Sequence, residues 1–361
     1  ARISEDYMEY SEKVFLSMDF FTCLAFSGFS LAARDGCGFG EATVRHSFVR
    51  IDEDSGHTPI FFPDTYVRKD DSGEIFEDEE NAEVEREDIY ARFGVFRLNT
   101  PTYDRGYGFT QSGRLYRAML FNIWEATVDE NGEPIPYAER QEKPIIYYLN
   151  TEFPARYRET AAEVGFEYNR IFKSMVADLK GVDESEVIDM FEVRTNDCNE
   201  TNIVNYVLQQ PELAYAVGRA ACGQNEMCGL PTEVGQRGPS DPDALQLELE
   251  QQIGIGNLKR VCTSLESATY DRPTGKSDFD WQRVGDLRNN MIVWLDNPQR
   301  SGWGGYGPMH ADALSGETIA ATSYIRGVYY EIGAANVADY ICFMNDEPDG
   351  AIGEIAYGQN I

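Results

Sequence analysis

The stretch PIIYYLNTEFPARYRETAAEVGFEYNRIFKSMVADLKG, residues 144–181, decides the fold class. Its first seven residues form a short apolar run that is typical of a buried strand. A helical pattern follows, because apolar residues recur at three- and four-residue steps. These residues are Tyr157, Ala161, Val164, Tyr168, Phe172, Met175 and Leu179. Pro154 suits the first turn of this helix and Gly181 suits its end, so the stretch predicts a strand and then a long helix.

Further strands on both sides of this unit predict an α+β fold. After the helix we expect strands in MFEVR (190–194), in DLRNNMIVWLD (286–296) and in GGYGPMHADALSGETIAATSYIRG (304–327). Between the first two lies a segment with four cysteines and many Gln, Asn and Gly residues, about 196–283, which we interpret as an insertion with some helix. Residues 141–361 are therefore predicted to form one mixed α/β subdomain with an insertion.

The region 1–140 is predicted to be β-rich. Alternating patterns in TVRHSFVRI (43–51), HTPIFFP (57–63) and YARFGVFRL (90–98) favour strands. The acidic link KDDSGEIFEDEENAEVERED (69–88) has like charges too dense to pack, so we expect a solvated loop there. The sequence Asp129-Glu130-Asn131-Gly132 predicts a hairpin turn, because Asn-Gly readily adopts positive φ angles.

The strongly acidic composition limits the possible partners. The chain has 62 acidic residues against 31 Lys and Arg, for a net charge of −31, which argues against nucleic acid or an anionic membrane as a partner. A solvated acidic surface is the favoured interpretation and calcium binding the alternative. The nearest calcium-loop pattern, residues 52–56, has Pro63 where a bidentate Glu is needed, so no EF-hand is predicted.

No membrane span is predicted. The longest apolar run, residues 14–33, contains Asp19 and Gly28 and lacks a basic flank at its start. We interpret it as core near the start of a mature fragment.

Cysteines favour an oxidising compartment. The seven cysteines are scattered and no C-x-x-C pair occurs, which favours disulfides over a compact zinc module. Buried reduced cysteines are the alternative, and the spacing alone does not give the connectivity. With disulfides, an extracellular or cell-surface location is expected.

No complete active site can be assembled from motifs. The three histidines, His46, His57 and His310, do not form an H-E-x-x-H pair, so no zinc helix is predicted. A G-x-S-x-G nucleophile elbow is absent. The string IGIGN (253–257) has Lys259 where a dinucleotide fingerprint needs its third glycine. We therefore assign no catalytic residue and no metal ligand.

Several strings together resemble the large secreted bacterial zinc-dependent metalloproteases of the zincin type. They include FGVFRLNTPTYDRGYGFTQSGRLYRAMLFNIW (93–124), VGDLRNNMIVWLD (284–296) and GYGPMHADALSGETIAAT (305–322), besides the strand and helix of 144–181. The resemblance implies a partial zincin-like mixed sheet with a long backing helix. It also implies an edge strand, in 304–327, that pairs with an extended peptide or protein substrate.

The family's G-Y-G-P loop and D-P-x-T-G-E-I turn have counterparts here. Tyr306, Gly307 and Pro308 match the loop, and Asp312, Gly316 and Glu317 match the turn. Ala313 replaces the family's Pro and Ser315 its Thr, departures that loosen the turn. The resemblance implies that the substrate cleft is lined by Tyr306, Gly307, Ala320, Ala321 and Thr322. It also implies disulfides Cys23–Cys37, Cys198–Cys262 and Cys222–Cys228, with Cys342 as the odd cysteine.

Zinc is expected for a full-length family member, but no ligand can be carried over to this chain. The family's H-E-x-G-H helix lies well downstream of the G-E-I strand, whereas here one helix-like stretch, residues 328–346, precedes the end at Ile361. We therefore expect the scaffold and substrate-edge-strand half of a secreted metalloprotease-like protein, not catalytic by itself. The alternative is a non-catalytic extracellular interaction or filament protein, a pseudoenzyme whose edge strand pairs with a neighbouring subunit.

Overall fold

The structure is a computed structural model that describes residues 2–17, 39–51, 57–61, 94–106, 108–223, 228–254, 256–296 and 304–345. At its centre is a six-stranded sheet of order β11-β13-β10-β6-β7, with β12 also beside β13. The strands are β6 (Ile145–Leu149), β7 (Phe191–Arg194), β10 (Asn290–Leu295), β11 (Gly305–Tyr306), β12 (Met309–Ala311) and β13 (Thr318–Arg326). Neighbours among β7, β6, β10 and β13 run parallel, whereas β11 and β12 run antiparallel to β13. The predicted mixed α/β character is confirmed.

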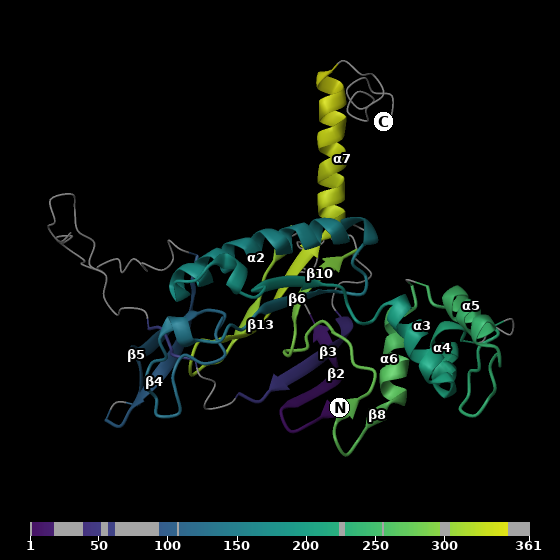
Figure 1. Cartoon of the computed structure of the whole chain (residues 1–361), viewed down its shortest axis with the longest axis horizontal. Coiled ribbons are helices and arrows are strands. Elements are labelled where there is room, and N and C mark those ends of the chain that lie inside the picture. The colour runs from purple at the N-terminus through teal and green to yellow at the C-terminus, as the bar shows by residue number, and fades with distance from the viewer. Residues whose placement is uncertain are drawn as a thin grey trace.

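Helix α2 (Arg158–Lys180) lies across one face of this sheet (Figure 1). It ends at Gly181, whose φ of 69° is left-handed, as the sequence predicted. Close contact between helix and sheet depends on Gly165, because a Cβ there would lie 2.8 Å from Val193 Cγ2 on β7. The strand-then-helix prediction for 144–181 is thus confirmed.

The buried face of α2 agrees with the predicted one only in part, since Ala161 and Phe172 pack against buried clusters as predicted but other members of the predicted face do not. Gly165, Val176 and Ala177 are buried, whereas Val164 and Tyr168 are 47% and 51% exposed. Met175 and Leu179 are exposed as well. The helix is rotated about its axis so that its smallest residue meets β7, and the apolar periodicity alone does not encode that choice.

The N-terminal region consists of antiparallel strands. Strands β1 (Arg2–Ile3), β2 (Tyr7–Ser17) and β3 (Phe39–Val49) form one sheet, and β4 (Phe96–Asp104) pairs with β5 (Gly108–Met119) in another. At the predicted turn, Gly132 has a φ of 80° and its N–H donates to Asp129 O at 3.0 Å. The acidic link 69–88, the segment 52–56 and most of the apolar run 14–33 lie outside the described residues.

The predicted insertion folds around a core of its own. Its helices are α3 (Glu200–Gln209), α4 (Ala214–Ala221), α5 (Pro242–Gln252) and α6 (Leu258–Ala268), followed by the short hairpin of β8 (Tyr270–Asp271) and β9 (Lys276–Ser277). The buried core includes Ile203, Val207, Val217, Leu249 and Leu265. These helices lie to one side of the sheet, and the β4–β5 hairpin lies on the other (Figure 1).

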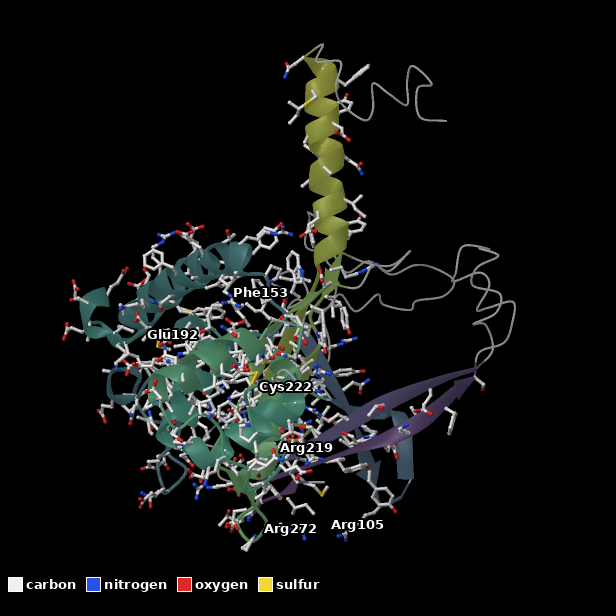
Figure 2. All side chains as sticks on the ribbon, turned by 90° about the vertical axis from the view of Figure 1, so that its right-hand side faces the viewer. Arg105, Phe153, Glu192, Arg219, Cys222 and Arg272 are labelled. Atoms are coloured by element: carbon white, nitrogen blue, oxygen red, sulfur yellow. A yellow bond between two sulfur atoms is a disulfide. The ribbon has the colours of Figure 1, made fainter. Side chains whose placement is uncertain are left out.

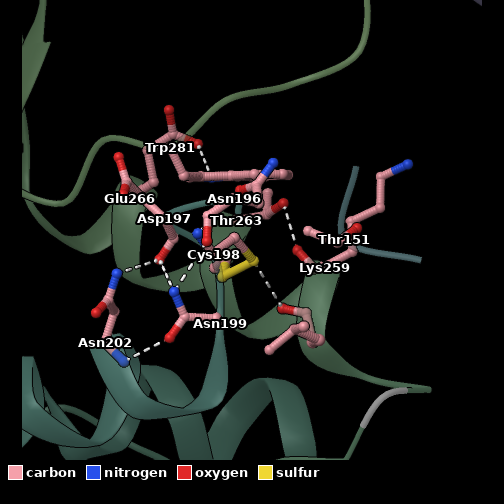
Figure 3. Close-up of a disulfide and its surroundings, with 12 residues drawn as sticks. Thr151, Asn196, Asp197, Cys198, Asn199, Asn202, Lys259, Thr263, Glu266 and Trp281 are labelled. Carbon is pink, nitrogen blue, oxygen red and sulfur yellow. Dashed lines mark hydrogen bonds between the residues drawn. A yellow bond between two sulfur atoms is a disulfide. The ribbon is translucent and has the colours of Figure 1, made fainter. Parts of the chain in front are cut away.

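Two disulfides connect elements of the insertion. Cys198 pairs with Cys262, and Cys222 pairs with Cys228 (Figures 2 and 3), as the family resemblance implied. Cys23 and Cys37 lie outside the described residues, and Cys342 lies in helix α7. The two bridges are consistent with an oxidising compartment.

A buried ion network fastens the insertion to the N-terminal sheet. Glu266 on α6 is fully buried, accepts a hydrogen bond from Trp281 Nε1 at 3.0 Å (Figure 3) and forms ion pairs with Arg2 and Arg283. Arg283 Nη1 also lies 2.9 Å from Glu9 Oε1 on β2. The network therefore joins three segments that are distant in sequence.

Helix α7 (Gly327–Met344) follows β13 directly and projects away from the rest of the chain (Figures 1 and 2). Its exposed apolar side chains are Tyr329, Tyr330, Ile332, Val337, Tyr340, Ile341, Phe343 and Met344. Among the described residues, no helix is both long and apolar enough to cross a bilayer.

Candidate functional site at the sheet edge

One edge of the central sheet is formed by β11 and β12, the two segments that flank Gly307 and Pro308, and the opposite edge by β7. Gly305 pairs with Ile325, Tyr306 with Tyr324, and Met309 with Ala321. Gly305 is required by close packing, because a Cβ there would lie 2.5 Å from Tyr324 O. Within the described residues, no strand pairs with the outer side of β11 or β12. Their outer backbone groups can therefore pair with an added strand.

The edge lies one strand further out than the sequence predicted. Residues 318–326 form β13, which pairs with β10 on one side and with β11 and β12 on the other. Ala320, Ala321 and Thr322 are buried; Ala321 N–H donates to Asn290 Oδ1 at 2.9 Å and Thr322 N–H to Pro308 O at 3.0 Å. These three residues lie in an inner strand, so the role of offering backbone groups to a substrate falls to β11 and β12 instead.

Tyr306 and Gly307 do lie on the edge. The Tyr306 ring stacks on the Tyr324 ring with centroids 4.6 Å apart, yet 52% of Tyr306 is exposed. Burial raises the pKa of Tyr324, and the neighbouring Tyr306 adds to the rise. The Tyr324 hydroxyl therefore stays protonated at neutral pH.

The turn between β12 and β13 is held by Asp312. Its carboxylate accepts hydrogen bonds from Leu314 N–H at 3.1 Å and Ser315 N–H at 2.8 Å. Burial acts to raise the pKa of Asp312, but bonds from Ser315 and Leu314 outweigh it and lower that pKa. Ser315 Oγ accepts from Glu317 N–H at 3.1 Å, so the Ser that replaces the family's Thr keeps a bonded hydroxyl.

The beginning of β13 is anchored by Leu120, which directly follows β5 and forms an isolated bridge with Glu317. Leu120 N–H donates to Gly316 O at 3.3 Å, and Thr318 N–H donates to Leu120 O at 2.8 Å. Gly316 has a φ of 81°, and a Cβ there would lie 2.4 Å from Ala118 O. The N-terminal β region therefore positions the turn that leads to the edge.

A polar cavity of about 340 Å³ opens at the start of β6, β10 and β13, and sequence reasoning missed it. Lys143 Nζ lies 3.2 Å from Glu317 Oε1 on its wall. Asn122 Nδ2 and Thr318 Oγ1 are buried there without a hydrogen-bond partner among the described residues. Burial lowers the pKa of His57, although the negative charge of Glu317 acts to raise it. Asn122 and Glu317 belong to separate strings of the sequence, and no spacing between those strings indicated that their residues would meet.

The three histidines do not meet. His46 on β3 contacts Glu12 Oε1 at 2.9 Å, His310 lies on β12, and His57 lies in the segment before Phe61. In the part of the chain that the structure describes, no group of three His, Cys, Asp or Glu side chains is arranged to hold a metal ion. The described residues thus do not fit a catalytic zinc ion, which needs three protein ligands.

Comparison with protein families, curated proteins and solved structures gave no match to this chain.

Proposed function

We propose that this chain is the scaffold and substrate-edge half of a secreted zincin-type metalloprotease-like protein, and that it binds an extended polypeptide without cutting it. The observation that carries the proposal is the open edge of β11 and β12 on a sheet that is otherwise parallel. An extended peptide adds to such an edge through main-chain hydrogen bonds.

The order of elements supports the family part of the proposal. The strand β6 leads into the long helix α2, which backs the sheet, and the G-Y-G-P string forms the edge beside β13, the strand that follows Gly316-Glu317. That is the arrangement the resemblance implies. The proposal includes the partial zincin-like identity of residues 141–361 and an extracellular or cell-surface location.

Zinc chemistry is not assigned to the described residues, because they offer no ligand set for the ion. In the proposed whole protein, a polypeptide segment outside the described part of this chain would hold the zinc ion. The ion would activate a water molecule for attack on a peptide carbonyl. This chain's contribution is to hold the substrate extended along β11 and β12.

Helix α7 favours a second candidate function. Its apolar side chains are exposed around its circumference, which is typical of a helix that packs against further protein. A non-catalytic extracellular assembly would use α7 and the open edge together to bind a neighbouring subunit. Both candidates predict a protein partner, and they differ in whether a zinc-bearing segment belongs to the same protein.

The test is to read the coding sequence beyond Ile361 and to assay its native product. If it continues into an H-E-x-x-H helix, we expect the purified product to bind one zinc ion per chain and to cleave extended peptides. A chelator should abolish that cleavage. A stop codon directly after Ile361, together with a native product free of zinc, would exclude the protease proposal and leave the assembly.

A further inference from the structure

We propose that the peptide bound at this edge is basic, and that an arginine of the peptide stacks on the outer ring face of Tyr306. This inference rests on the proposed function, because it names the kind of peptide that the same edge binds. It follows from the register of β11, from the chain's own arginine contacts and from its charge.

The register places a peptide side chain directly over Tyr306. Facing residues of antiparallel strands have their side chains on one face, about 4.5–5.5 Å apart. Tyr306 faces Tyr324, and their nearly parallel rings, inclined by 12°, leave Tyr324 against the inner face of Tyr306. The outer face of the Tyr306 ring is therefore where the facing residue of an added strand would lie.

Among the described residues, the immediate chain neighbours of Tyr306 leave room for a long, planar side chain. Its neighbours Gly305 and Gly307 carry no side chains. Two residues earlier, a Cβ at Gly304 would lie 3.1 Å from Tyr330 Oη, so the α7 hydroxyl covers that position. Gly304 directly precedes β11, so Tyr330 Oη lies near the start of that strand, where it can accept a hydrogen bond from a guanidinium group.

This chain already uses the same contact between its own strands. The Arg97 guanidinium on β4 lies 4.6 Å from the centroid of the Tyr116 ring on the paired strand β5, diagonally across the pair, because the register places Asn99 opposite Tyr116. Arginine also lies over tyrosine at Arg288 and Tyr7, at 4.3 Å. An arginine on an added strand, facing Tyr306 or diagonal to it, would make at Tyr306 the ring contact that Arg97 makes at Tyr116.

Net charge favours arginine over an aromatic residue at this position. The chain has a net charge of −31, and a field of that sign raises the local concentration of cationic peptides. A phenylalanine would stack on the ring equally well but would gain nothing from the field. A basic peptide therefore combines strand pairing, stacking on Tyr306 and electrostatic attraction.

The test compares fluorescence anisotropy of three labelled ten-residue peptides of Thr, Val and Ser that carry a single central Arg, Gln or Phe. We expect Tyr306→Ala to weaken binding of the Arg peptide about fivefold and to leave the Gln peptide unchanged. Tyr306→Phe keeps the ring and should bind as the native chain does. Tyr168→Ala is the matched control, since Tyr168 is 51% exposed and also stacks on a ring, that of Phe191.

Tighter binding of the Phe peptide than of the Arg peptide would overturn the inference, as would equal losses for the Arg and Gln peptides in Tyr306→Ala. A fourth peptide, the Arg peptide with alternate backbone nitrogens methylated, tests the proposed function separately. If it binds as tightly as the unmethylated peptide, strand pairing itself is wrong, whatever Tyr306 contributes.

Discussion

The insertion of α3–α6 and the outer part of the central sheet differ in how completely their apolar side chains and backbone groups are buried or paired. The insertion has its own apolar core, two disulfides and a buried ion network that joins it to β2. The sheet leaves the outer side of β11 and β12 unpaired within the described residues, and α7 projects beyond it. Stability is concentrated in the insertion, whereas the surfaces suited to a partner lie at the sheet edge and α7.

The largest effect is expected at the network that fastens the insertion. Glu266→Gln leaves the buried Arg283 and the partly buried Arg2 without their common carboxylate, and should lower the free energy of unfolding by about 3–5 kcal/mol. Urea unfolding followed by tryptophan fluorescence measures the loss. Glu250→Gln on the exposed side of α5 is the control and should change stability by less than about 0.5 kcal/mol. Equal effects of the two substitutions would show that the network does not stabilise the insertion.

The two disulfides should contribute unequally. Removing Cys198–Cys262 with paired Ala substitutions opens a loop with a separation of 64 residues and should cost about 4 kcal/mol in the chain-entropy model. Removing Cys222–Cys228, with a separation of 6, should cost only about 2 kcal/mol. The same urea experiment ranks them, and a larger loss for the short loop would contradict the argument.

A smaller effect is expected where the chain enters β10. Asp286 is buried; burial acts to raise its pKa, but hydrogen bonds and charge from Arg288 outweigh this and lower it. A carboxylate with a lowered folded pKa stabilises the protein above its unfolded pKa of about 3.9, and this contribution is lost as the pH falls through the folded value. Asp286→Asn should cost about 1.5–3 kcal/mol at pH 7.

The pH profile checks the sign of that effect. Between pH 7 and about pH 5 the difference in unfolding free energy between native and Asp286→Asn chains should stay constant. Below about pH 4 it should shrink as Asp286 becomes protonated. A difference that grows on acidification would mean that the carboxylate is not stabilised by Arg288.

The smallest effect on stability is expected on α7. Tyr340 and Ile341 are 57% and 54% exposed, so serine at both positions should change the free energy of unfolding by less than about 0.5 kcal/mol each. Removal of this apolar surface should nevertheless reduce association with other protein. Sedimentation velocity of native and substituted chains over a concentration series measures this association. A large loss of stability would mean that α7 packs within its own chain, and would weaken the contrast with the insertion.

The contrast also separates what the sequence predicted from what it did not. The periodicity of residues 144–181 predicted β6 and α2, and the Asn-Gly pair predicted the turn at Gly132, because these signals are local. The rotation of α2 was missed because it depends on the contact between Gly165 and Val193.

The edge and the cavity were missed for the same physical reason. Strands β11 and β12 have two and three residues, too few for an alternating pattern, so the longer run of β13 was interpreted as the edge. The cavity gathers Asn122, Lys143 and Thr318 from segments far apart in the chain. Both are products of tertiary pairing, which single-sequence patterns do not encode.

Amide hydrogen exchange in the presence of the Arg peptide tests the central claim, that β11 and β12 accept an added strand. At saturating peptide, we predict slower exchange in residues 305–311, because their outer N–H groups gain main-chain partners. Exchange in α4 of the insertion, Ala214–Ala221, should be unchanged. Binding of the peptide with unchanged exchange in residues 305–311 would contradict the account.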